Sequence, residues 1–138
     1  MDQSISSTLS PQGPLAERPR KASLEYGVKY LNTPLIVVLG HTECGAVKAA
    51  LSEGTLKGSL PKLIELIRPG LGENAAMPVD EAVKANVWHS IAEIFGGSPG
   101  LTEMVKTGNI KIVGAVRDLN TGTVTWLGPH PKQDQFTK

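Results

Sequence analysis

The sequence has few of the features that place a protein in a membrane, an oxidising compartment or on nucleic acid. It has one cysteine in 138 residues, which excludes an internal disulfide. No apolar run approaches the roughly 20 residues of a membrane span, and the start has no charged-then-apolar signal pattern. The formal net charge of +1 gives no electrostatic reason to bind nucleic acid or a membrane surface. We therefore expect a cytoplasmic protein that binds neither.

The length fits a single domain that is preceded by a short tail. Residues 1–20 contain serine, glutamine, proline and glycine and little that can pack in a core. They predict a flexible tail, or an arm that lies on a neighbouring chain. The apolar pattern begins at Lys21, so the predicted domain is 21–138.

One stretch organises the rest of the chain. Residues 35–39 are all apolar, which is typical of a strand buried on both faces of a parallel sheet. His41 and Cys44 follow where this strand gives way to a helix, which Thr42 can cap and whose positive end suits Glu43. Ligands of open α/β sheets bind at the carboxyl ends of strands, so these residues stand where chemistry is expected.

The remaining pattern predicts a small α/β layered domain. It is a short, mainly parallel sheet with an antiparallel edge strand, flanked by helices, and we expect Trp126 of the edge strand to lie in the core. The expected helices are 21–31, 42–54, 59–68, 78–97 and 98–108, and the expected strands are 35–39, 110–116 and 123–127.

A histidine and a cysteine three residues apart suit a soft divalent metal. Imidazole and thiolate together favour zinc over magnesium or calcium, and the positive helix end favours the thiolate form that binds metal. The alternative is that Cys44 packs as a small apolar residue while His41 bonds to the backbone. The spacing alone leaves both interpretations open.

Five blocks of sequence occur in an order and spacing that identify a family. They are Ser23-Leu24-Glu25-Tyr26-Gly27-Val28, the run from Leu35 to Ala50, Ala85-Asn86-Val87, Ser98-Pro99-Gly100-Leu101, and the run from Gly108 to Gly122. Together they resemble the β-class carbonic anhydrases over residues 22–128. The resemblance implies an α/β fold and zinc-dependent interconversion of carbon dioxide and bicarbonate, a lyase activity. It also implies self-association, because members of this family are built on dimers.

The resemblance implies a zinc site made by cysteine, histidine and cysteine, with the fourth position left for water. Zinc makes hydroxide available at neutral pH, and hydroxide attacks the carbon of CO2. His41 matches the histidine ligand of the family and Cys44 matches its second cysteine. The catalytic residues of this chain are not assigned.

The chain departs from the family pattern at its beginning. The first block of the family, a strand ending in Cys-x-Asp-x-Arg, has no counterpart, so the resemblance covers the carboxyl-terminal two-thirds. A third zinc ligand is therefore expected from Glu43, Asp118 or a neighbouring chain, because His89 lies within a long helix and His130 in a polar tail. Without it, the protein is expected to be a non-catalytic homologue with a binding or assembly role.

Two further expectations follow from the same departure. Cys44 at a helix start is also a candidate reactive thiol, in a redox or anion site. The apolar strand 35–39 loses the neighbour that it has in the family, and an exposed edge of this kind is an aggregation hazard. We therefore expect a homodimer or higher oligomer that covers this edge.

Overall fold

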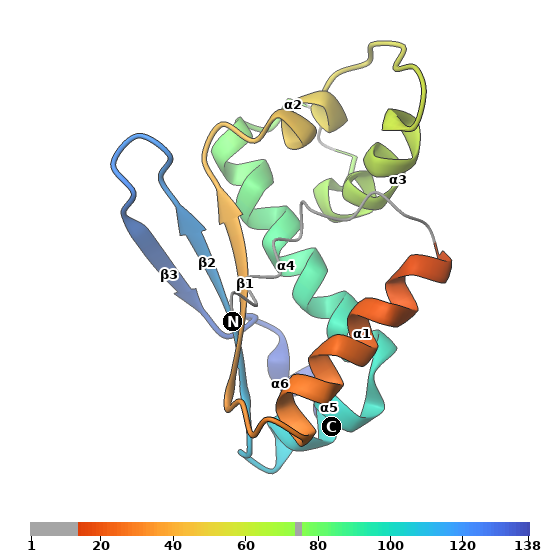
Figure 1. The fold of residues 1–138 in the computed structure, drawn as a ribbon. Helices are drawn as coiled ribbons and strands as arrows, with labels where there is room; N and C mark the ends of the chain where they lie inside the picture. The colour runs from red at the N-terminus through yellow and green to blue at the C-terminus, as the bar shows by residue number, and fades with distance from the viewer. Residues whose placement is uncertain (1–13, 74–75) are drawn as a thin grey trace.

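The computed structural model describes residues 14–73 and 76–138. Its element order confirms the predicted series and adds a short helix at the end (Figure 1). The elements are α1 (Pro14–Lys29), β1 (Leu35–His41), α2 (Gly45–Leu51), α3 (Leu60–Leu71), α4 (Val79–Gly97), α5 (Pro99–Lys106), β2 (Lys111–Arg117), β3 (Val124–Gly128) and α6 (Gln133–Phe136). None of the helices in these ranges is both long and apolar enough to cross a membrane.

The sheet is mixed and has the order β1-β2-β3. β1 pairs with β2 in parallel, from Leu35 opposite Lys111 to His41 opposite Arg117. β3 pairs with β2 in the antiparallel direction, as predicted for the edge strand. β1 forms the other edge, because β2 is its only ladder partner among the described residues. The α/β fold class is thereby confirmed.

Helix α4 packs on β1 and β2, and two glycines let it approach. A Cβ atom at Gly40 would lie 2.9 Å from side-chain carbons of Val83 and Val87, and one at Gly114 would lie 2.8 Å from Val87. Figure 1 shows α1, α2, α3 and α5 gathered around α4 on the side away from β3. Val83 belongs to the apolar cluster under α2 and α3, whereas Val87 and Ile91 belong to the one under α1 and α5, so α4 joins both halves of the core.

The opposite face of the sheet carries exposed apolar side chains. Gly114 faces α4, and strand residues alternate between faces, so the next residue, Ala115, faces the other side of the sheet. Trp126 pairs with Ala115 and therefore faces that side too. Trp126 is 62% exposed, and Leu35 and Val124 on the same face are 41% and 38% exposed. The prediction that Trp126 lies in the core is wrong. Alternation along β3 shows which residues share a face of the sheet, but it does not show which face the helices cover.

The ends of the helices differ in places from the sequence prediction. α1 begins at Pro14 rather than near Lys21, so part of the predicted tail is helical. The rest of that tail, residues 1–13, lies outside the described residues, and the division into tail and domain stays a prediction. α6 was not predicted; it forms where the ring of Phe136 stacks on Phe95 with centroids 5.2 Å apart.

Candidate metal site

The carboxyl ends of β1 and β2 lie side by side and are tied together by Thr42. The Thr42 N–H donates to the carbonyl of Arg117 over 2.9 Å. The Thr42 hydroxyl oxygen accepts the backbone N–H of Leu119 over 3.1 Å. The predicted capping role of Thr42 is wrong, because its hydroxyl oxygen is used to hold the loop after β2 against the loop after β1.

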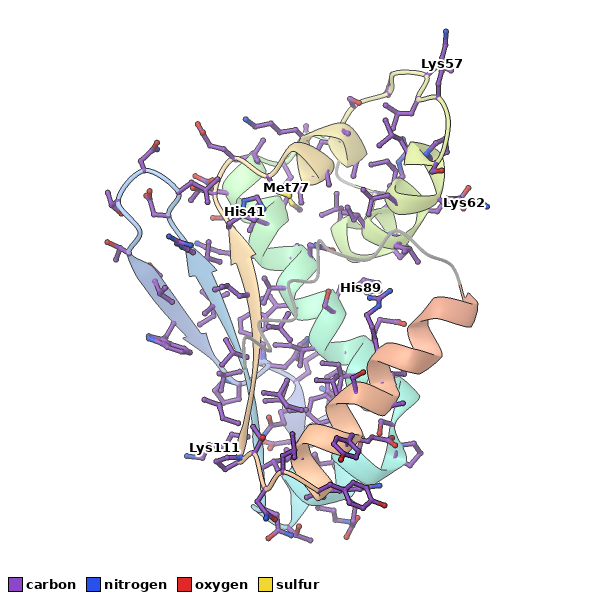
Figure 2. All side chains as sticks on the ribbon, viewed as in Figure 1. His41, Lys57, Lys62, Met77, His89 and Lys111 are labelled. Carbon is purple, nitrogen blue, oxygen red and sulfur yellow. The ribbon has the colours of Figure 1, made fainter. Side chains whose placement is uncertain are left out.

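His41 ends β1 and is partly buried, at the turn toward α2 (Figure 2). Its Nδ1 lies 2.9 Å from the carbonyl oxygen of Thr42. A carbonyl oxygen only accepts hydrogen bonds, so this contact requires the proton on Nδ1. In the neutral imidazole Nε2 then carries the lone pair, which is the state in which imidazole binds a metal.

Cys44 occupies the N-cap position of α2, with φ −60° and ψ 113°, and its side chain makes no capping hydrogen bond. It is only 2% exposed and belongs to the apolar cluster of α2, α3 and α4. Glu43, one residue earlier, has φ 54° and an exposed side chain. The tight turn therefore buries the thiol and leaves the neighbouring carboxylate in solvent.

Asp118 lies just past β2, but its carboxylate closes a turn. Oδ1 accepts the backbone N–H groups of Asn120, over 2.7 Å, and Thr121, over 3.0 Å. These two bonds, led by that of Thr121, lower the pKa of Asp118 from its ordinary value. The sequence Asp-Leu-Asn-Thr-Gly carries the signal for this role, because aspartate commonly bonds to the backbone two residues on.

The other two histidines lie elsewhere in the described chain. His89 is in α4, apart from His41 in Figure 2, and lines a cavity between α1, α3 and α4. His130 packs edge-on against Trp88, with ring centroids 5.5 Å apart, and burial lowers the pKa of His130. Neither histidine therefore lies with His41 and Cys44 as a further ligand.

The donor types at this site fit zinc, but their number does not. Imidazole and thiolate are preferred zinc ligands, and a catalytic zinc site takes three protein ligands. Among the described residues, no group of three histidine, cysteine, aspartate or glutamate side chains is arranged to hold a metal ion. Neither Glu43 nor Asp118 therefore completes the site with His41 and Cys44 within these ranges.

Comparison with known families gives this arrangement its context. The model of the family described as carbonic anhydrase matches residues 7–124. The chain belongs to the carbonic anhydrase family. Carbonic anhydrase 2 of Mycobacterium tuberculosis is 39% identical over 107 residues, which make up 72% of this chain and 52% of that protein. The carbonic anhydrase of Mycolicibacterium smegmatis is 38% identical over 109 residues, or 74% and 53%.

Solved structures place this carbonic anhydrase homologue in the β-class fold. A Coccomyxa β-carbonic anhydrase in complex with acetazolamide matches with a TM-score of 0.63 and 28% identity, over 89% of this chain and 56% of that one. One of two tetrameric β-carbonic anhydrases from Sordaria macrospora matches with a TM-score of 0.65 and 22% identity, over 86% and 62%. The predicted family is thereby confirmed, and the chain spans about half the length of the curated relatives it matches.

Proposed function

We propose that this chain is a cytoplasmic protein of the carbonic anhydrase type that contributes His41 and Cys44 to a zinc site. The reaction is the reversible hydration of CO2 to bicarbonate, in which water supplies the oxygen and a proton is released. It requires a third ligand from outside the described residues, either elsewhere in the protein or on another chain. The chemistry of bound zinc is the supply of hydroxide at neutral pH.

The hydrogen bond of His41 is the observation that carries this proposal. The Thr42 carbonyl accepts a hydrogen bond from Nδ1, so Nε2 is the nitrogen that the neutral imidazole offers to a metal, at the carboxyl end of a buried parallel strand. Backbone carbonyls hold metal-binding histidines in this way and set their ring orientation. The same bond is expected of the alternative in which His41 only bonds to the backbone, and metal content separates the two.

A non-catalytic homologue is the second candidate. It is favoured by Cys44, which is buried in an apolar cluster without a second cysteine in the sequence. A thiol in such surroundings packs like a small apolar residue. In this case the scaffold would serve binding or assembly and the site would hold no metal.

Metal content and activity separate the two candidates. Protein produced with added zinc is analysed for zinc per chain, and CO2 hydration is followed by stopped-flow pH change. The proposal expects bound zinc and activity that both fall in His41→Gln and Cys44→Ser. His89→Gln is the matched control, because this histidine lies in α4 outside the site, and it should retain both.

The outcomes are distinct. A wild-type protein without zinc and without activity would support the non-catalytic homologue. Zinc retained in both His41→Gln and Cys44→Ser would place the metal elsewhere and contradict the ligand assignment. Alkylation of Cys44 adds a third comparison. A metal-bound thiolate reacts only after a chelator is added, a free activated thiol reacts at once, and a buried structural thiol does neither.

Self-association is part of the same proposal. β1 has a bare edge among the described residues, and the face that carries Trp126 is apolar and exposed. An unpaired apolar edge readily recruits another chain. A second copy of this chain is the partner that we propose, and it is also a candidate source of the missing ligand.

A further inference from the structure

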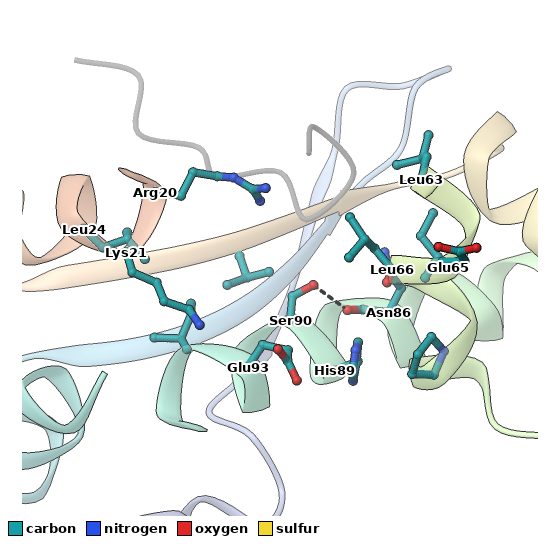
Figure 3. Close-up of a pocket in the computed structure, with 14 residues that line it drawn as sticks. Arg20, Lys21, Leu24, Leu63, Glu65, Leu66, Asn86, His89, Ser90 and Glu93 are labelled. Atoms are coloured by element: carbon teal, nitrogen blue, oxygen red, sulfur yellow. Dashed lines mark hydrogen bonds between the residues drawn. The ribbon is translucent and has the colours of Figure 1, made fainter. Parts of the chain in front are cut away.

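A cavity of about 270 Å³ lies between α1, α3 and α4 (Figure 3), and Val38 of β1 is also among its lining residues. Neither His41 nor Cys44 lines it, so it is separate from the candidate metal site. Leucine and isoleucine side chains from all three helices form its apolar part, including Leu24, Leu66 and Ile94. Its size suits a short-chain organic molecule, since pockets for drug-sized ligands are typically about 300–1,000 Å³.

A buried, unpaired nitrogen of Arg20 indicates that the cavity binds a ligand. Its Nη2 atom is buried and has no hydrogen-bond partner among the described residues. Buried polar groups in folded proteins are almost always paired, and a guanidinium nitrogen is costly to leave unpaired because it carries charge. Figure 3 shows Arg20 reaching from α1 toward the α3 side of the cavity. A group that accepts hydrogen bonds is therefore expected there.

No other charged side chain in the described lining is the hydrogen-bond acceptor for Arg20. Lys21, also on α1, extends toward α4 in Figure 3, and its ammonium lies beside Gly97 at the end of that helix. Glu65 and Glu93 line the cavity too, but both side chains are exposed and neither forms an ion pair with Arg20. Their charges are screened by solvent, so the inner α1 wall favours an anion.

We propose that this cavity binds a small organic carboxylate with an apolar tail. The carboxylate accepts hydrogen bonds from the Arg20 guanidinium, whose planar fork matches its two oxygens. The tail lies against Leu24, Leu66 and Ile94, where it is removed from water. The ligand site is independent of the metal proposed at His41 and Cys44.

Hexanoate is a suitable probe, because it joins one carboxylate to a short apolar chain. Titration calorimetry and amide NMR shifts measure its binding to the full chain, and we expect shifts at His89 and Ser90, which line the cavity. Arg20→Gln should weaken binding at least about tenfold, as expected for loss of a charge-assisted hydrogen bond. Arg117→Gln is the matched control: it removes one arginine charge at the exposed end of β2 and should leave affinity unchanged.

A second variant and two further probes keep the test independent of folding. Leu66→Trp fills the cavity from the α3 side and should abolish hexanoate binding while the melting temperature is retained. Hexanol, which lacks the charge, and hexylamine, which reverses it, should bind at least about tenfold more weakly than hexanoate. Equal affinity of wild type and Arg20→Gln for hexanoate, or shifts confined to residues outside the cavity, would overturn the proposal.

Discussion

Single polar side chains hold the loops after β1 and β2 and the start of α5 in place. Thr42 and Asp118 each accept backbone N–H groups in the loops that follow β1 and β2. Ser98 accepts the N–H of Leu101 over 3.4 Å at the start of α5 and donates to the carboxylate of Glu25 in α1. Two of these bonds, Thr42 with Leu119 and Ser98 with Glu25, connect segments that are 77 and 73 residues apart in the sequence.

Replacement of Ser98 by alanine should lower the free energy of unfolding by about 2 kcal/mol. The side chain is fully buried, so its loss leaves the N–H of Leu101 and the carboxylate of Glu25 without a partner. Urea unfolding of the variant measures the effect. Ser59→Ala is the control, because Ser59 precedes α3 but makes no capping hydrogen bond, and it should change stability by less than about 0.5 kcal/mol. Equal losses in both variants would contradict the role of Ser98.

Asp118→Asn should lower stability at neutral pH, with the difference disappearing in acid. The folded state lowers the pKa of this carboxyl below the unfolded value of about 3.9. The charged form therefore stabilises the fold above that pH, and the stabilisation is lost as the pH falls through the lower, folded pKa. Unfolding free energies of both proteins between neutral and acid pH test this. A difference that stays constant with pH would exclude the charge as its cause.

The type of site was predictable from the sequence, but its contacts were not. His41 and Cys44 follow an unbroken apolar run, and this pattern alone places them at the carboxyl end of a buried strand. The hydrogen-bond partner of the Thr42 hydroxyl could not be predicted, because Leu119 lies 77 residues away in the chain. Likewise, Arg20 showed no signal, since the cavity that it faces is formed by helices distant in sequence.

Among the elements, α4 has the largest structural role. It contacts both strands of the parallel pair and belongs to both apolar clusters. Its predicted boundaries and its stripe of valine and isoleucine agree closely with the structure, because a long periodic pattern gives a strong signal. α1 was predicted less well at its start, where Arg18 and Pro19 interrupt the apolar pattern.

The approach of α4 to the sheet predicts the effect of a methyl group at Gly114. Gly114→Ala should destabilise the protein by about 1–3 kcal/mol, because the new Cβ would meet Val87 at 2.8 Å and Trp88 at 3.3 Å. Gly27→Ala is the matched control within α1, where a Cβ has nothing within 4 Å. It should stabilise by about 0.5–1 kcal/mol, since alanine favours a helix over glycine. Urea unfolding measures both, and a stable Gly114→Ala would show that α4 can shift.

At the scale of the whole molecule, the described helices and the core lie on one side of the sheet. The other side presents Leu35, Val124 and Trp126, and the β1 edge beside it has no partner among the described strands. The bare edge was expected from the resemblance, because the family strand that flanks 35–39 has no counterpart in this sequence. The sequence did not predict the exposed face, which depends on where the helices pack.

We expect the protein to self-associate through this side of the sheet. Light scattering after gel filtration should give a mass at least twice the 14.6 kDa of one chain. Trp126→Glu should shift the protein toward the monomer, because it places a charge in the apolar face. Leu60→Glu, at the exposed start of α3, is the control and should leave the mass unchanged. A wild-type monomer at all concentrations would contradict the proposed self-association.

The pairing of β1 with β2 also affects how the chain is made. β1 is synthesised before four helices, and its first residue pairs with Lys111, so it waits for about 76 further residues. At about 5–20 residues per second, that delay is roughly 4–15 s. During this interval β1 has no ladder partner, and until α4 is complete at Gly97 it also lacks the helix that covers it. Nascent β1 is therefore the segment where chaperones would bind and where slowed translation would lower the soluble yield.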